Sequence, residues 1–141
     1  AEGRDALVTA PGIRFEHGGY EHHVVEVTDA GARTEVGAGG ATTAVPFGTV
    51  VRVAGIVRVL AHPAYEVAFE RLRAWRAQKA IGKPAYTVFS DASLREVAAR
   101  LPTDEVGLRA ISGVGPAKLD AYGNDLLALT SELRAGDLSG G

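Results

Sequence analysis

The apolar residues of this 141-residue chain change their spacing near residue 61. Before that point, short runs of β-branched residues alternate with glycine-containing turns, a pattern typical of strands. After it, apolar residues recur at intervals of three and four, which is typical of amphipathic helices. The sequence therefore predicts an α+β protein with two domains, a strand domain over residues 1–61 and a helical domain over residues 62–135. The remaining residues, 136–141, are expected to form a disordered tail.

The strand domain is predicted to be a small five-stranded β-barrel. Short strands with glycine turns and no helix-length segment between them are typical of such barrels. The expected strands cover residues 20–27, 32–36, 42–45, 49–53 and 56–60. On this strand spacing and the corner Pro46-Phe47-Gly48, residues 12–60 resemble the SH3-like or Tudor-like barrels found at the C-terminal ends of some superfamily 1 helicases, the UvrD-like ones included.

The helical domain is predicted to contain five helices. Tyr65, Phe69, Leu72 and Trp75 form the apolar stripe of the first helix, which should end near Gly82. Ser90 or Asp91 can cap the second helix, although Ser93 with Glu96 also fits a capping box and would start it a few residues later. Thr103 can cap a short third helix that extends to Ile111. Pro116 in a first turn should start a fourth helix, and Gly123 should end it. The fifth carries Leu126, Leu129 and Leu133.

Two segments distinguish this helical domain more specifically than the spacing of its apolar residues does. The first is Pro84–Asp91 with the amphipathic helix after it, and the second is Ile111–Leu119, which contains Gly113-Val114-Gly115-Pro116. Together they resemble the HRDC domain, the small helical module named for helicases and RNase D. The resemblance covers residues 62–134 and implies a non-catalytic accessory module that helps a helicase or nuclease hold nucleic acid. RecQ-type helicases place a winged helix before this module, so the strand-rich first half favours a UvrD-like or other superfamily 1 parent.

The first segment is a candidate nucleic-acid contact. Arg76, Lys79 and Lys83 follow i, i+3, i+7 spacing, so they can share one helix face that ends beside Tyr86. An exposed tyrosine ring can stack on any base, and single-strand binding by this loop is also what the HRDC resemblance implies. The alternative is a plain solvated helix face, with Tyr86 packed beside the core residues Val88 and Phe89.

The second segment is a candidate phosphate contact. A glycine-rich turn that opens a helix can direct backbone N–H groups outward, and the helix dipole adds partial positive charge there. Gly113 and Gly115 would form this turn, and Lys118 could reach a phosphate. The segment also resembles half of a helix-hairpin-helix motif. In the alternative interpretation, the glycines allow two helices to approach closely and Val114 fills the core.

The charge limits how strongly the chain can bind nucleic acid. Residues 1–61 carry five Arg and seven Asp or Glu, a net charge of −2, whereas residues 62–134 carry ten Lys or Arg and nine Asp or Glu, a net charge of +1. We therefore expect weak, salt-sensitive binding of single-stranded or junction DNA by the helical domain. The rival hypothesis is a protein-interaction module that docks on the helicase motor or on a partner such as RNA polymerase.

Several other functions lack their sequence signatures. The chain has no cysteine, no G-x-x-x-x-G-K-[ST] phosphate loop and no tight carboxylate cluster, so we expect a non-catalytic region without a cofactor. The HRDC resemblance implies a helicase parent, which would use ATP and magnesium. His17, His22 and His23 could in principle hold a metal, but surface histidines are the preferred interpretation, and no metal site is predicted. No apolar run reaches the roughly 18 residues of a membrane span, and no signal segment begins the chain, so a cytoplasmic bacterial protein is expected.

Overall fold

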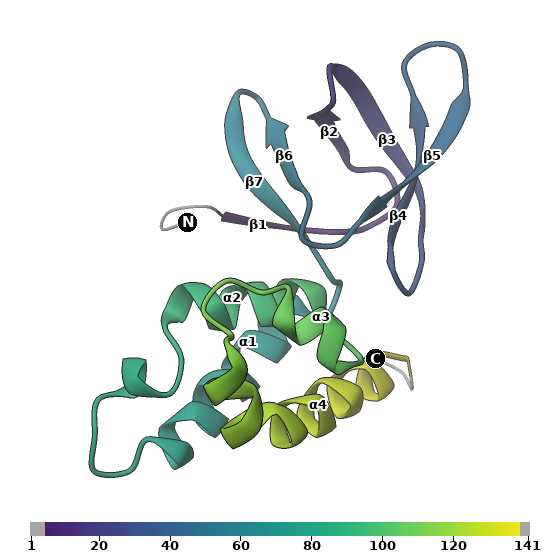
Figure 1. Cartoon of the computed structure of the whole chain (residues 1–141). Coiled ribbons are helices and arrows are strands. Elements are labelled where there is room, and N and C mark those ends of the chain that lie inside the picture. Colours follow the sequence, from purple (N-terminus) through teal and green to yellow (C-terminus); the bar gives the residue numbers. More distant parts are fainter. Residues whose placement is uncertain (1–4, 139–141) are drawn as a thin grey trace. The chain divides into compact units, whose positions relative to one another are not determined.

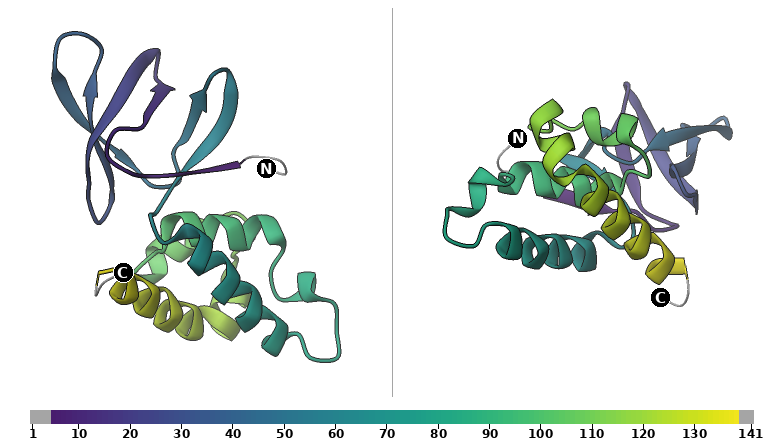
Figure 2. Two further views of the ribbon diagram at one scale, coloured as in Figure 1. Left: turned by 180° about the vertical axis from the view of Figure 1, so that it is seen from behind. Right: turned by 60° about the horizontal axis from the view of Figure 1, so that its bottom comes forward.

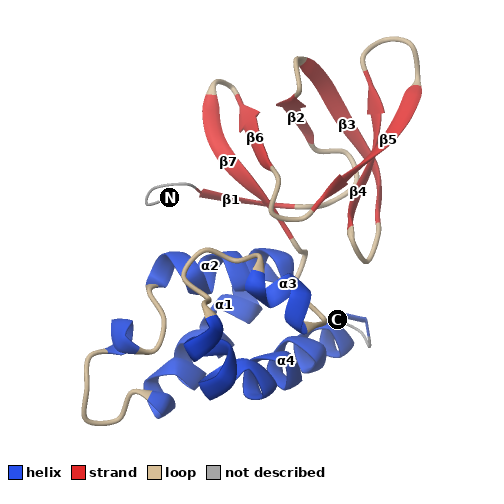
Figure 3. Ribbon diagram, in the orientation of Figure 1, coloured by secondary structure: helices blue, strands red, loops and turns tan. Residues whose placement is uncertain are grey.

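The computed structural model describes residues 5–138, and the chain divides into two compact units between Pro63 and Ala64. Strands are found in the first unit and helices in the second, as Figure 3 shows. The division lies two residues beyond the boundary expected from the sequence. Within the described range, no helix combines the length and the apolar character that crossing a bilayer requires.

The first unit is a single seven-stranded sheet (Figure 1). Its strand order is β1-β7-β6-β2-β3-β4-β5, and every neighbouring pair is antiparallel except β1 with β7. The strands are β1 (Asp5–Val8), β2 (Arg14–His17), β3 (Tyr20–Val27), β4 (Gly31–Val36), β5 (Ala41–Pro46), β6 (Val50–Val53) and β7 (Ile56–Ala61). One buried cluster forms its core: Phe15, Val24, Ala32, Val45, Val51 and Leu60.

The predicted five-stranded barrel is wrong in strand number and in closure. The sheet has seven strands, and over residues 5–138 no pairing joins its edge strands β1 and β5. The two strands that the sequence did not indicate, β1 and β2, have four residues each and are too short to show alternation. In β2, Phe15 alone is buried. Strand β1 pairs with β7, about fifty residues away along the chain, and no local pattern encodes such a contact.

The second unit contains four α-helices and one turn of 3-10 helix. They are α1 (Tyr65–Lys79), η1 (Ala85–Thr87), α2 (Asp91–Arg100), α3 (Glu105–Arg109) and α4 (Pro116–Leu138). Ser90 caps α2, because its hydroxyl accepts a hydrogen bond from the Ser93 amide at 3.1 Å. Asp104, rather than the expected Thr103, caps α3 through the amide of Gly107 at 2.8 Å.

The prediction of five helices is wrong because Gly123 does not end the fourth. Helix α4 continues through Gly123 to Leu138. A glycine inside a helix costs roughly 1 kcal/mol relative to alanine, which packing can offset. Here Leu119, one turn earlier in the same helix, lies 3.5 Å from the position that a Cβ of Gly123 would occupy, which is ordinary van der Waals contact. Residues 136–138 are therefore helical rather than part of a disordered tail, and residues 139–141 lie outside the described range.

Phe89 lies at the centre of the helical core, as the sequence predicted. It is 2% exposed, and its ring centroid lies 6.1 Å from that of Trp75 on α1 and 5.7 Å from that of Tyr122 on α4. The preceding residue, Val88, is fully buried. The loop between α1 and α2 is thus anchored to the core at its C-terminal end.

Replacing Phe89 by alanine should lower the free energy of unfolding by about 3–5 kcal/mol, because it removes a large ring from a packed core. Urea denaturation of wild type and variant measures the difference. Tyr86→Ala, in the same loop but at a side chain 72% exposed, is the control and should unfold close to the wild-type midpoint. Equal destabilisation by both variants would contradict this assignment of the two rings.

Candidate nucleic-acid interface

The loop between α1 and α2 presents apolar side chains to solvent. Ile81 is 81% exposed, and Tyr86 on η1 is 72% exposed. Within residues 5–138, the exposed side chain of Lys83 makes no ion pair or hydrogen bond. The views in Figures 1 and 2 agree that this loop projects from the helical unit. A ring held this way is accessible to a stacking partner.

Lys118 joins the start of α4 to this loop. Its Nζ donates a hydrogen bond to the Thr87 carbonyl and lies 5.5 Å from the centroid of the Phe89 ring. Thr87 is the residue after Tyr86, so the structure brings together Lys118 and Tyr86, which are far apart in the sequence. An ammonium group has three N–H donors, and the bond to Thr87 uses one of them.

The other predicted cations do not share a face. Arg76 is buried, and its guanidinium donates to the Phe89 carbonyl at 2.9 Å and to Asp91 on α2 at 2.8 Å. The ammonium of Lys79 pairs at 2.7 Å with Asp125, which lies on α4. Two members of the predicted stripe of Arg76, Lys79 and Lys83 thus already have partners within the helical unit. Arg76 is enclosed by the fold, and Lys79 is tied to a neighbouring helix.

The ion pair of Arg76 changes the acidity of Asp91. The hydrogen bond from the Arg76 guanidinium is the largest effect, and the positive charges of Arg76, Arg95 and Arg73 add to it. Together they outweigh the opposing effect of desolvation and hold the pKa of Asp91 below its ordinary value. The Asp91 carboxylate at the start of α2 is also favoured by the helix dipole.

The two glycines of the second segment have different surroundings. Gly113 has a φ of +91°, and a Cβ there would lie 2.3 Å from Oγ of Ser93, whose hydroxyl donates to the Ser112 carbonyl at 2.8 Å. No atom lies within 4 Å of a Cβ placed on Gly115. Val114 between them is buried, and its amide already donates to the Ile111 carbonyl at 3.1 Å. Close packing therefore explains Gly113, whereas Gly115 faces open space.

Two of the three clustered histidines, His17 and His22, contact the sheet through their rings. His22 is buried, contrary to the surface position expected for it, and its ring nitrogens lie 2.8 Å from Oγ1 of Thr34 and 3.1 Å from the His17 carbonyl. It also stacks on Phe15 with the ring centroids 5.2 Å apart. Among residues 5–138, no group of three His, Asp or Glu side chains is arranged to hold a metal ion.

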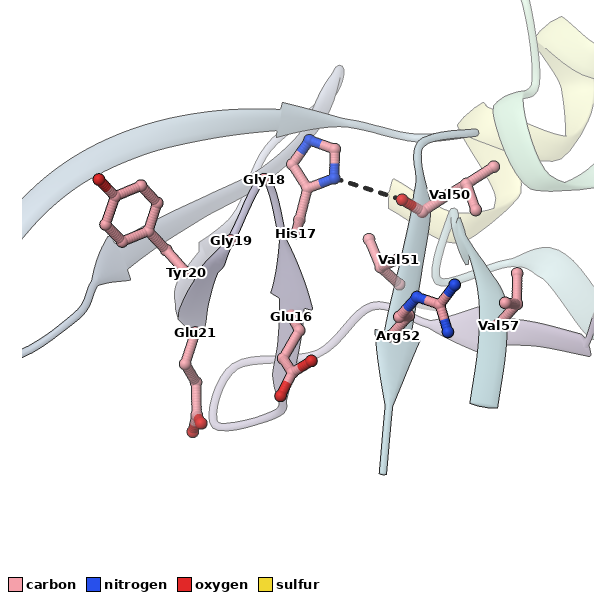
Figure 4. A pocket seen from close by; sticks show the side chains of 10 residues that line it. All are labelled: Glu16, His17, Gly18, Gly19, Tyr20, Glu21, Val50, Val51, Arg52 and Val57. Atoms are coloured by element: carbon pink, nitrogen blue, oxygen red, sulfur yellow. Dashed lines mark hydrogen bonds between the residues drawn. The ribbon is translucent and has the colours of Figure 1, made fainter. Parts of the chain in front are cut away.

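The strand unit contains a pocket that the sequence did not indicate. It lies between the β2–β3 and β6–β7 hairpins and has a volume of about 480 Å³ (Figure 4). Strands β2 and β6 pair only at Glu16 with Arg52, and beyond that point a ring nitrogen of His17 reaches the Val50 carbonyl at 3.3 Å. Tyr20, 63% exposed, also lines the pocket. The sequence feature that could have indicated this pocket is Tyr20, an aromatic residue directly after the Gly18-Gly19 turn.

Comparison with known proteins identifies the helical unit. Residues 66–130 match the model of the HRDC domain family. The ATP-dependent DNA helicase UvrD2 of Mycobacterium tuberculosis is 46% identical over 61 residues, which are 42% of this chain and 9% of that protein. The ATP-dependent DNA helicase RecQ of Haemophilus influenzae is 42% identical over 69 residues, 48% of this chain and 11% of that protein. A solved structure, "D. radiodurans RecQ HRDC domain 3", is 31% identical, with a TM-score of 0.46, and the match covers 49% of this chain and 93% of that one.

The predicted HRDC domain is thereby confirmed over residues 66–130. It is a non-catalytic accessory domain of helicases, in agreement with the expectation that this region carries no enzyme active site. The chain spans about a tenth of the length of the two curated relatives described above.

Gly113→Ala should destabilise the helical unit, whereas Gly115→Ala should not. The new methyl group at position 113 would clash with Ser93, and a positive φ is unfavourable for alanine. We expect a loss of about 2–4 kcal/mol in the free energy of unfolding for Gly113→Ala. Urea denaturation of both variants measures this, and equal stability of the two would contradict the packing role of Gly113.

The Arg76–Asp91 pair should make stability depend on pH. Because folding lowers the pKa of Asp91, its ionised form stabilises the protein above the unfolded pKa, and this contribution is lost as the pH falls through the folded pKa. Asp91→Asn should therefore be less stable than wild type at pH about 7, and the difference should shrink below pH about 4. Urea denaturation across that range measures it, with Asp120→Asn as the exposed control. A difference that stays constant with pH would show that the charge of Asp91 is not responsible.

Proposed function

We propose that this chain is a non-catalytic accessory region of a DNA helicase, whose helical unit binds single-stranded or junction DNA weakly and without sequence specificity. The observation that carries the proposal is the exposed ring of Tyr86 on a projecting loop, with Lys83 in the same loop and Lys118 bonded to the adjacent Thr87. The names of the relatives support it, because both UvrD2 and RecQ are ATP-dependent DNA helicases.

The chemistry of the loop favours binding without base selection. Stacking of a base on an aromatic ring contributes about 1–3 kcal/mol and accepts every base, since each has a π face. Lys83 and Lys118 offer charge to the phosphates, but ammonium groups on flexible stems read no sequence. Of the residues that the sequence suggests for this site, we propose Lys83, Tyr86 and Lys118 as the contacts to DNA. Gly115 can let a strand approach closely, while Arg76, Lys79 and Gly113 hold the structure that presents the contacts.

The parent protein would supply the catalysis. In this proposal its motor domains bind ATP and magnesium, and the chain described here contributes a DNA contact during repair or recombination in a bacterium. In this proposal the parent is a UvrD-like superfamily 1 helicase, and the open strand unit of this chain would precede its HRDC domain; both UvrD2 and RecQ are among the relatives.

A second function, docking on a protein, is favoured for the strand unit by one observation. The pocket lined by Tyr20, Glu16 and Arg52 lies in the unit that carries the net negative charge. Tyrosines are enriched at protein interfaces, and a net acidic surface repels phosphates. The partner in this case would be the helicase motor domains or another protein such as RNA polymerase.

Fluorescence anisotropy with a labelled oligothymidine tests DNA binding by the intact chain. Affinity should be weak and should fall as salt rises, because phosphate contacts release counterions. Tyr86→Ala should weaken binding by about fivefold or more through loss of stacking. Tyr20→Ala removes a similarly exposed tyrosine from the strand unit and should leave binding unchanged. No binding by wild type at low salt would refute the DNA proposal and favour protein docking.

A further inference from the structure

A second group of basic and aromatic side chains lies where α1 meets α2. We name it the Arg73–Arg95 cluster, and it comprises Phe69 and Arg73 on α1 and Arg95 on α2. Both guanidinium carbons lie 5.7 Å from the centroid of the Phe69 ring. Phe69 is half-buried against the helical core, and Tyr65 stacks on it with ring centroids 6.1 Å apart and planes within 4° of parallel. The ring thus holds two guanidinium groups at one place on the helical unit.

The cations of this cluster are only weakly committed to other partners. Arg95 forms no ion pair with a carboxylate within residues 5–138, and its guanidinium group lies over the Phe69 ring. Arg73 pairs with Glu70 at 3.8 Å, with both side chains at least half exposed. Such an exposed pair contributes roughly 0–1 kcal/mol, so a better acceptor can replace it. Asp91, the acidic side chain influenced by both arginines, is already hydrogen-bonded by Arg76.

We propose that Arg73 and Arg95 form a second phosphate contact for the DNA strand whose base stacks on Tyr86. The inference rests on the proposed function and adds a second binding site to it. Two guanidinium groups over one ring can each offer a planar fork of N–H donors to phosphate oxygens, a geometry that arginine provides and lysine does not. The ligand class is the phosphodiester backbone of a single strand.

Continuity with the Tyr86 loop favours a nucleic-acid strand over an acidic peptide. Arg73 lies about one turn before Arg76 on α1, and Arg95 lies about one turn after Asp91 on α2. Arg76 bonds both Asp91 and the carbonyl of Phe89, which ends the Tyr86 loop. The Arg73–Arg95 cluster and the Tyr86 loop therefore lie on either side of the Arg76–Asp91 pair. A strand long enough to pass Arg76 can contact both.

The test compares two lengths of labelled oligothymidine, about 4 and about 20 nucleotides, which bracket common single-strand site sizes. In the intact chain, the double variant Arg73→Gln/Arg95→Gln should bind the long strand about tenfold more weakly and the short strand as wild type does. For this variant, the slope of log K against log salt concentration should be shallower by about 1.4, because two phosphate contacts on a single strand are lost. Arg33→Gln/Arg109→Gln removes two exposed arginines elsewhere and is the charge-matched control.

The possible results separate this inference from the proposed function. If the double variant binds the long strand like wild type while Tyr86→Ala loses affinity, the cluster proposal is overturned and the DNA function stands. If the control variant loses as much as the double variant, the effect is general charge, which also overturns it. A competition assay with oligoglutamate distinguishes an acidic protein partner. If oligoglutamate displaces the long strand from wild type as well as unlabelled DNA does, but not from the double variant, the cluster is assigned to such a partner instead. No binding by wild type at low salt would refute both proposals. Thermal melting of each variant confirms that it is folded.

Discussion

The arrangement of the helical unit depends on the buried side chain of Arg76. Its guanidinium donates hydrogen bonds to the Phe89 carbonyl and the Asp91 carboxylate. The backbone carbonyl of the same residue accepts a hydrogen bond from the Ala80 amide at 2.9 Å. Ala80 and Phe89 are both buried and stand at the two ends of the loop that carries Tyr86. One residue of α1 therefore fixes both ends of the loop and the start of α2. Because its ends are held, the loop can expose Ile81 and Tyr86 without loosening the core beneath it.

Pairing of basic with acidic side chains also explains why a chain with many cations is nearly neutral. Two ion pairs join α1 to α4, Lys79 with Asp125 and Arg71 with Glu132. Arg134 reaches the carbonyl of Leu101 at 2.6 Å. In each of these contacts the positive group already has a partner within the unit, so it joins two parts of the fold and is less available to a phosphate. The residues that remain for a ligand are those whose partners are absent or weak.

The sequence predicted the local features of this unit well and its neighbour relations poorly. The Ser90 cap, the start of α4 at Pro116 and the buried Phe89 follow from short-range rules, and the structure confirms them. The spacing of Arg76 and Lys79 places them on α1, but it cannot say that α2 and α4 cover different sides of that helix. For the same reason Arg95 was overlooked, because its relation to Phe69 exists only once α2 packs beside α1. The parallel pairing of β1 with β7 is equally invisible to local patterns.

A cation that is already paired contributes less to phosphate binding than its charge suggests. Binding must then break the existing ion pair and leave its carboxylate close to a phosphate, so less free energy is gained. Lys79, bonded to Asp125, is in this position, whereas Lys83 and Arg95 have no carboxylate partner within residues 5–138. In the proposed interface, affinity would therefore come from stacking on Tyr86 and from a few unpaired cations. Such a contact forms and breaks easily on any sequence, and an accessory domain needs this property if it is to follow a strand that a motor is moving.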